Sequence, residues 1–240
     1  MMAAIWASRQ GKKVCLVEQN GTLGQKLLLS GGGRCNFTNA EYDHNQLIQA
    51  YGREGAFLHS AFTQFSPKET LEFFYNLGMG MKVEENNPVF PKSDRAQDLL
   101  GHLQKELQKH EVEVLFNTKL LDLQKSGKKI EKATLESNGQ KMEIKAERYI
   151  LAGGGKSYPK TGSNGSLQEI LKRLGHKVGA IRPALTPINI KEKWTQNLQG
   201  ISARDIKVKI FQNNQRKYEF AGDVLFTHFG LSGPAILDAS

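Results

Sequence analysis

The sequence has few cysteines and no long apolar run. Its two cysteines, Cys15 and Cys35, follow neither the spacing of a metal site nor that of a disulfide framework. No apolar segment is long enough to span a bilayer. Residues 1–7 carry no basic stretch ahead of their apolar side chains, which a secretory signal would need. The sequence therefore argues against a disulfide-stapled or membrane-spanning protein, and we expect a cytoplasmic location.

Acidic residues are fewer than basic ones, 24 against 33, so the formal net charge is +9 at pH 7. Such an excess suits an anionic ligand, and it equally suits RNA. The lysines are spread through predicted helices and hairpins and form no compact basic run. We therefore expect a small-molecule substrate, and we expect neither a nucleic-acid partner nor a membrane partner.

Glycine, by contrast, is abundant and clustered, with 24 residues in all and a triplet at 31–33. Consecutive glycines lose much conformational entropy on folding and bring no side chain to pack. A chain keeps them where another group approaches the backbone closely or where φ is positive. The triplet is followed by a dense set of polar side chains and a thiol, namely Arg34, Cys35, Asn36, Thr38 and Asn39. This pattern is typical of a ligand-binding loop, and a purely structural surface turn is the alternative.

The stretch before this loop has the pattern of a nucleotide-binding unit. Residues 1–10 predict a helix, and residues 12–18 predict a buried strand that contains Cys15 as a small core residue and ends in Glu18. In the dinucleotide fingerprint an acidic residue lies about 20 residues beyond a Gly-x-Gly-x-x-Gly turn. The first strand and that turn would therefore precede the first residue, and we expect the chain to begin within the motif.

Local signals predict most of the remaining elements. A helix is expected to begin at Pro67, because Ser66 caps it and Glu69 completes a capping box. Asn138-Gly139 is the strongest hairpin signal in the chain. The other predicted elements are a helical stretch at 46–65, a helix capped by Ser93, a strand at 111–116, a meander at 120–124, 130–136 and 141–146, a buried strand at 149–152 leading into a second glycine triplet at 153–155, and a helix at 166–174.

A second domain is predicted after residue 182. Residues 206–211 alternate polar and apolar side chains, turn at 213–214 and return through 217–220, which is typical of an antiparallel sheet with one wet face. We therefore expect domains at 1–182 and 183–240. The sequence stops within a predicted helix, so we expect it to be cut short at this end too.

Two motifs give the chain a family resemblance: Ser-Gly-Gly-Gly-Arg-Cys-Asn at 30–36 and Gly-Gly-Gly-Lys-Ser-Tyr-Pro-Lys-Thr-Gly at 153–162. Over essentially its whole length the chain resembles a bacterial family of NAD(P)/FAD-dependent oxidoreductases, which includes proteins named aminoacetone oxidase and bile-acid dehydro-reductase. The resemblance implies an α/β fold. It would comprise a Rossmann-like FAD-binding domain that lacks its first strand and glycine turn, a β-meander, and the start of a β-rich second domain.

On this resemblance we assign cofactor contacts to ten residues: Glu18, Lys26, Gly31, Gly32, Gly33, Arg34, Cys35, Asn36, Gly153 and Gly154. The carboxylate at the strand end would accept both hydroxyls of the adenosine ribose of FAD. Lys26 and Arg34 would neutralise the pyrophosphate, the arginine bidentately, although a solvated role for the lysine is an equal alternative. The backbone N–H groups of the first triplet would face the phosphates or the flavin ring.

The other assignments are less specific. Gly153 and Gly154 would end a core strand against the cofactor, where a side chain would collide. Asn36 would bond the ribityl chain or hold the loop. Cys35 could be reactive, yet a lone cysteine without a partner is more often a packing residue, and no catalytic residue is assigned. We expect the two triplets to converge on the cofactor.

The function predicted in this way is that of a fragment of an FAD-dependent oxidoreductase. It would pass electrons between the flavin and either a reduced nicotinamide, NAD(P)H, or a small organic substrate, while the protein orients the reactants. Two alternatives stay open. One is a flavoprotein that modifies RNA, and the other is a non-catalytic, truncated remnant.

Overall fold

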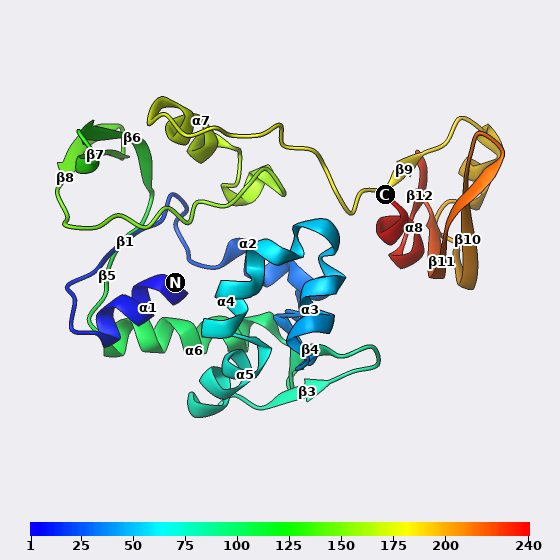
Figure 1. Ribbon diagram of the computed structural model, residues 1–240, viewed down its shortest axis with the longest axis horizontal. Helices are drawn as coiled ribbons and strands as arrows, with labels where there is room; N and C mark the ends of the chain where they lie inside the picture. The colour runs from blue at the N-terminus through cyan, green and yellow to red at the C-terminus, as the bar shows by residue number, and fades with distance from the viewer. The chain divides into compact units, whose positions relative to one another are not determined.

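The computed structural model describes residues 1–240, which form two compact units, Met1–Val178 and Gly179–Ser240 (Figure 1). Each unit has its own buried apolar cluster. The domain limits predicted from the sequence, 1–182 and 183–240, stay a prediction. The expected α/β class is confirmed, because the first unit combines helices with a parallel strand pair and the second is built on an antiparallel sheet.

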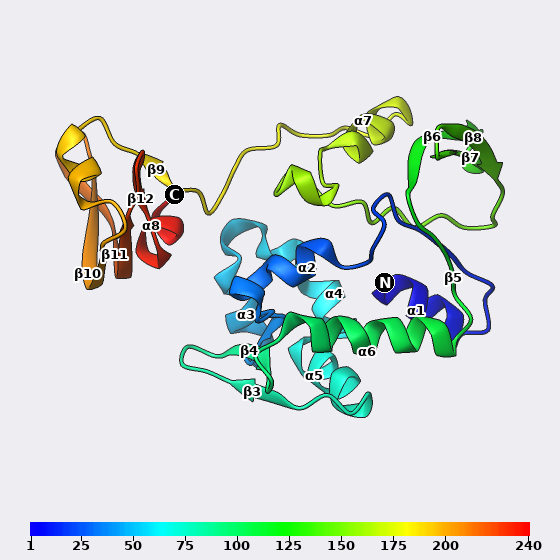
Figure 2. The same ribbon diagram turned by 180° about the vertical axis from the view of Figure 1, so that it is seen from behind.

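Unit 1 begins with the predicted helix and strand, α1 (Met2–Arg9) and β1 (Cys15–Val17). Strand β1 pairs in parallel with β5 (Glu113–Leu115), which follows the long helix α6 (Ala96–Lys109). Helices α1 and α6 lie side by side in both views (Figures 1 and 2). Their apolar faces meet in the largest buried cluster, which includes Ile5, Leu99, Leu103 and Leu107.

The strand predicted to be buried is only partly so, and the prediction for Cys15 was wrong. Val14 and Leu16 pack against the α1–α6 cluster, whereas Cys15 is exposed. Side chains alternate between the two faces of a strand. Cys15 shares its face with Val17, which packs against the apolar cluster that includes Leu123 and Leu135, but Cys15 itself is left exposed.

The glycine loop follows in the order α2 (Gln25–Leu29), the 3₁₀ helix η1 (Ser30–Gly33) and the short strand β2 (Thr38–Asn39). Strand β2 joins β3 (Met81–Val83) and β4 (Pro88–Pro91) in a sheet of order β2-β4-β3. The predicted helical stretch 46–65 is divided into three pieces: α3 (His44–Ala50), η2 (Gly52–Leu58) and α4 (His59–Gln64).

Helix α5 (Pro67–Asn76) confirms the predicted capping box. The backbone N–H of Lys68 donates to Ser66 Oγ at 3.1 Å, and the N–H of Ser66 donates to Glu69 Oε2 at 2.8 Å. The prediction that Ser93 caps the next helix was wrong. Helix α6 begins at Ala96 behind Arg95, and no side chain caps it. Its start depends instead on the burial of Ala96, Leu99 and Leu100 in the core.

This difference predicts different outcomes for two serines. Ser66→Ala removes a cap that bonds the helix backbone, so we expect unit 1 to lose about 1 kcal/mol of unfolding free energy. Ser93→Ala, the matched control, removes an exposed hydroxyl that caps nothing, and its effect should be near zero. Urea unfolding followed by the fluorescence of Trp6 in a Trp194→Phe background would report unit 1 alone. Equal losses from the two variants would contradict the assignment of the cap.

The predicted meander is confirmed as β6 (Thr118–Ser126), β7 (Lys129–Ser137) and β8 (Gln140–Ile144), paired antiparallel in that order. Both central residues of the turn at Asn138-Gly139 have positive φ, as the hairpin signal requires. Helix α7 (Ser166–Arg173) packs its buried Ile170 into the same cluster as Leu123 and Leu135 of the meander.

The buried strand predicted at 149–152 is absent. These residues pair with no strand, and Ile150 is 66% exposed. A central strand requires a hydrogen-bonded neighbour on each side, and among the described residues β1 pairs with β5 alone. The apolar composition of this segment is therefore not sufficient for it to form a strand.

Unit 2 contains β9 (Ile188–Asn189), the 3₁₀ helix η4 (Lys193–Leu198), β10 (Ser202–Gln212), β11 (Gln215–Phe226), β12 (Gly230–Ser232) and α8 (Pro234–Ala239). The strands form one antiparallel sheet of order β10-β11-β12-β9. The predicted hairpin between β10 and β11 is confirmed, and α8 buries Ala235 and Ile236 against Val208 and Val224. Neither unit contains a helix of the length and apolarity that crossing a bilayer demands.

Candidate functional site

The carboxyl end of β1 is held in place by backbone hydrogen bonds. The N–H of Glu18 donates to the carbonyl of Leu115 at 2.9 Å, and the N–H of Thr118 donates to the carbonyl of Glu18 at 3.0 Å. The carboxylate is fixed as well, because its Oε1 accepts from both the backbone N and the side-chain Nδ2 of Asn20, each at 2.8 Å. Glu18 thus presents an oriented carboxylate at the edge of the parallel pair.

A second loop is tied to this edge. The amide Nδ2 of Asn20 also donates to the carbonyl of Thr161 at 3.1 Å, and Gln19 Nε2 donates to the carbonyl of Gly162. Both acceptors lie at the end of the 3₁₀ helix η3 (Pro159–Thr161). Sequence reasoning missed Gln19 and Asn20, although two amides directly after a strand-ending acid were a usable signal.

Lys26 completes this group from helix α2. Its ammonium donates to Ser163 Oγ at 2.6 Å, and Ser163 is buried. The lysine is half-buried, yet no carboxylate lies within 4.0 Å of its Nζ. A Cβ on Gly154 would lie 2.7 Å from Ser163 Oγ and 3.8 Å from Lys26 Nζ. Three of the predicted residues, Glu18, Lys26 and Gly154, therefore lie beside the same loop. Asn20 links Glu18 to Thr161, and Ser163 contacts Lys26 and lies next to Gly154.

The first triplet forms the exposed turn η1. The φ angles of Gly31, Gly32 and Gly33 are +56°, +66° and +88°, values that glycine adopts without steric cost. A Cβ on Gly31 would lie 2.7 Å from the backbone N of Asn36, whereas one on Gly32 would meet nothing within 4 Å. The turn thus needs glycine at one position for space and at all three for conformation, and it leaves backbone groups accessible.

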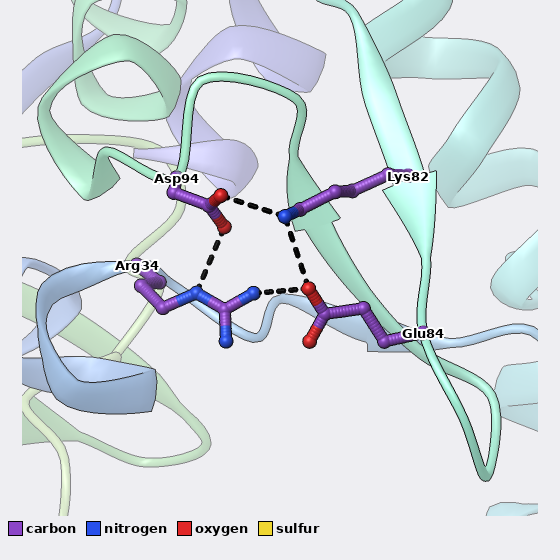
Figure 3. A network of polar contacts seen from close by, with 4 residues as sticks. All are labelled: Arg34, Lys82, Glu84 and Asp94. Atoms are coloured by element: carbon purple, nitrogen blue, oxygen red, sulfur yellow. Dashed lines mark hydrogen bonds and ion pairs between the residues drawn. The ribbon is translucent and has the colours of Figure 1, made fainter.

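Arg34 lies in a ring of four charged side chains (Figure 3). Its Nη2 donates to Glu84 Oε1 and its Nε donates to Asp94 Oδ1 at 2.8 Å, while Lys82 bridges the same carboxylates at 3.0 and 2.6 Å. The guanidinium also lies 4.0 Å above the ring of Phe90. The carboxylates occupy Nε and Nη2 but not Nη1, so the predicted bidentate phosphate contact of Arg34 stays a prediction.

The ring also favours the ionised carboxylates. Hydrogen bonds from Arg34 and then Lys82 lower the pKa of Glu84, and hydrogen bonds from Lys82 and then Arg34 lower the pKa of Asp94. The pKa of the Arg34 guanidinium is raised by the hydrogen bonds to the same two carboxylates. All four groups are therefore charged together at neutral pH.

The remaining assignments receive packing explanations. Cys35 is 3% exposed, and burial raises the pKa of its thiol, so the proposal of a reactive cysteine is not supported. The side chain of Asn36 is exposed. A Cβ on Gly153 would lie 3.2 Å from the side chain of Leu167 in α7. The prediction that Gly153 ends a core strand was wrong, because residues 149–152 form no strand. The nearest neighbour of a side chain at this position would be Leu167.

Two hollows of unit 1 lie away from these residues. One, of about 320 Å³, is bounded by α1, α5 and α6 and includes Arg9, His102 and Glu106. The other, of about 380 Å³, lies beside Met79 and Pro91. None of the ten predicted site residues lines either hollow, and the expected convergence of both triplets on the cofactor stays a prediction. Gly154 of the second triplet lies near Lys26, and helix α2, which contains Lys26, directly precedes the first triplet.

Comparison with known proteins places this geometry in context. The sequence model of the HI0933-like protein Rossmann domain matches residues 1–233. Among curated proteins, the chain is 31% identical to 3-dehydro-bile acid delta(4,6)-reductase of Clostridium scindens and 28% identical to ribosomal RNA dihydrouridine synthase of Escherichia coli. Both matches cover 100% of this chain and 57% of the relative, so the chain spans somewhat more than half the length of these proteins.

A solved structure, that of Thermovibrio ammonificans THI4, aligns with a TM-score of 0.45 at 11% identity, covering 73% of this chain and 58% of that one. The match to the family extends over almost the entire sequence and includes the strand end, both triplets and the meander. The chain therefore belongs to the HI0933-like family of FAD-binding oxidoreductases, whose Rossmann domain it carries.

Proposed function

We propose that this chain binds FAD at the carboxyl end of β1, as part of an oxidoreductase of the length of its relatives. The observation that carries the proposal is the ammonium of Lys26, which is half-buried, has a hydroxyl partner and lacks a carboxylate within 4.0 Å. Partly burying a charge without an opposite charge is unfavourable, and a phosphate would supply that charge. The pyrophosphate of FAD is such a group.

The donor set near Lys26 fits the adenosine half of the cofactor. Glu18 holds an oriented carboxylate at a strand end, which is the group that accepts ribose hydroxyls in dinucleotide sites. The exposed backbone of Gly31–Gly33 offers N–H groups without side chains to block them. These residues would hold the ribose and neutralise phosphate charge.

When bound, FAD would supply transfer of a hydride or an electron pair, with NAD(P)H as the proposed donor and a small organic molecule as the proposed substrate. One curated relative is named a delta(4,6)-reductase and the other a dihydrouridine synthase, and both names describe the addition of hydrogen to an unsaturated compound. We therefore propose the reduction of an unsaturated ring as the reaction class. This chain's own residues would bind and orient the cofactor.

A second candidate function is the modification of RNA. It is favoured by the ribosomal RNA dihydrouridine synthase relative, at 28% identity, and by the net charge of +9. Retention of the chain on immobilised ribosomal RNA at 50 mM salt, with release at 200 mM, would support it, because phosphate contacts weaken steeply with salt. Equal recovery at both salt concentrations would reject it.

Lys26→Met tests the cofactor proposal. Loss of one charged phosphate contact should raise the dissociation constant for FAD about tenfold, as measured by quenching of flavin fluorescence in titrations of the 240-residue chain. Lys128→Met is the matched control, because this exposed lysine lies in the turn between β6 and β7. Its dissociation constant should equal that of the wild type.

Two outcomes would contradict the proposal. The first is a wild-type chain that unfolds cooperatively yet shows no quenching with FAD, which would favour a folded, non-catalytic remnant. The second is binding that Lys26→Met and Lys128→Met weaken to the same extent, which would indicate a general charge effect at some other surface.

A further inference from the structure

The glycine turn has few attachments of its own. Within η1, the N–H of Arg34 donates to the carbonyl of Gly31 at 3.3 Å and the N–H of Cys35 donates to that of Ser30 at 3.0 Å. Both bonds are local, and three successive glycines provide no side chain to anchor the turn to the rest of the unit. The position of the turn therefore depends on its two flanks: Leu27 and Leu28 of α2, which pack against the main cluster, and the residues that follow the turn.

Two of those residues leave the turn in different directions. Cys35 is buried among the apolar residues of the main cluster. Arg34 instead crosses to the β3–β4 hairpin, where Glu84 follows β3 and Asp94 follows β4. The guanidinium therefore joins the turn to both ends of the hairpin, while its flat face covers Phe90 of β4.

The arrangement of charges makes this connection specific. Each carboxylate lies between two cations and each cation between two carboxylates, so the ring is neutral as a whole (Figure 3). The guanidinium thus has a carboxylate partner at Nε and another at Nη2. The planar fork of Arg34 reaches the two carboxylates through separate nitrogens while its face covers Phe90, and the single ammonium of a lysine at this position would not do both.

We propose that Arg34 is a positioning residue, which with Glu84, Lys82 and Asp94 latches the Gly31–Gly33 turn to the β3–β4 hairpin and so fixes the backbone N–H groups that the proposed FAD site uses. The identity of the ligand rests on the proposed function. The latch itself rests only on the ring of four charged side chains. It differs from direct phosphate binding in one measurable consequence. Releasing Arg34 from its carboxylates should harm the site, whereas a phosphate-binding arginine would gain from its release.

The double variant Glu84→Gln/Asp94→Asn makes this distinction. It leaves Arg34 and Lys82 in place, removes both negative charges, and makes the region more positive. With the latch, we expect amide hydrogen exchange of residues 31–37 to accelerate about fivefold without FAD, and the dissociation constant for FAD to rise about fivefold. With a phosphate-binding Arg34, exchange would be unchanged and FAD would bind more tightly, and that result would overturn the proposal.

Two further variants complete the experiment. Arg34→Lys keeps the charge but loses the planar fork, so it should accelerate exchange nearly as much as Arg34→Met, whereas rescue to the wild-type rate would contradict the latch. Glu143→Gln, the control, breaks the exposed Lys132–Glu143 pair between β7 and β8 and should change neither readout. Because hydrogen exchange is measured without cofactor, the latch is tested even if the wild-type chain fails to bind FAD.

Discussion

Gly31→Ala should destabilise unit 1 by about 3 kcal/mol and abolish the proposed binding of FAD. Two costs add at this position. The residue has a φ of +56°, which costs an alanine about 1 kcal/mol, and the new Cβ would lie 2.7 Å from the backbone N of Asn36. Since the atom in the way belongs to the backbone, the turn itself must move, and with it the N–H groups of the triplet.

Gly32→Ala provides the control within the same turn. Its φ of +66° imposes a similar conformational cost, but its Cβ would point into open space. We expect about 1 kcal/mol of destabilisation and little change in the affinity for FAD. Urea unfolding reported by Trp6 in the Trp194→Phe background, with flavin-quenching titrations, would measure both effects. If the two alanines behave alike, the close approach at Gly31 has no consequence for the turn.

Arg9→Met should cost about 3 kcal/mol at neutral pH, because it removes the main partner of a buried carboxylate. Glu106 of α6 is 5% exposed and accepts from Arg9 Nη2 at 2.6 Å. Burial raises the pKa of Glu106, but the hydrogen bond from Arg9 and the charges of Lys109 and His110 outweigh this, so the pKa is lowered overall. The methionine keeps apolar contact with Trp6 and Phe73, over which the arginine lies.

The sign of the pH dependence follows from this lowered pKa. In the wild type, the carboxylate contributes stability above the ordinary pKa of a glutamate, and this contribution is lost as the pH falls through the lowered value. In Arg9→Met the carboxylate is poorly compensated and takes up a proton more readily, so the difference between the proteins should shrink in acid. Unfolding midpoints in urea at pH 7 and pH 4 would measure it.

A double variant provides the control for the arginine. Arg9→Met/Glu106→Met places an apolar side chain where the unpaired carboxylate would be, so most of the loss at pH 7 should be recovered. A deficit in Arg9→Met that is independent of pH, or one that the double variant shares in full, would show that the packing of Arg9 matters more than its charge.

Elements with local signals could be predicted from the sequence. The capping box at Ser66, Pro67 and Glu69 involves residues within one helical turn, and the Asn138-Gly139 hairpin needs only the conformations of two residues. Neither depends on distant partners, so the sequence pattern was sufficient. Both motifs of the family resemblance are likewise continuous in sequence, and the family match confirms the family that they indicated.

The failed predictions share a dependence on distant partners. Residues 149–152 are apolar but lack a strand to pair with, and Cys15 is exposed although Val17 on the same strand face is packed. Ser93 precedes a helix whose start is set by the burial of its own first residues, from Ala96 onward. In each case a short apolar or polar pattern was compatible with the prediction, but packing or pairing with distant segments decided the outcome.

The candidate site divides in the same way. The sequence by itself determined the candidates for this site, namely a strand-ending acid, a lysine in the following helix and two glycine triplets, because family motifs and backbone requirements are continuous in the sequence. Only the tertiary structure decided their partners: Lys26 meets Ser163 across 137 positions, and Arg34 meets Glu84 across 50. The physical reason is that the partner of a charged side chain depends on which chain segments fold beside it, and no local pattern specifies this.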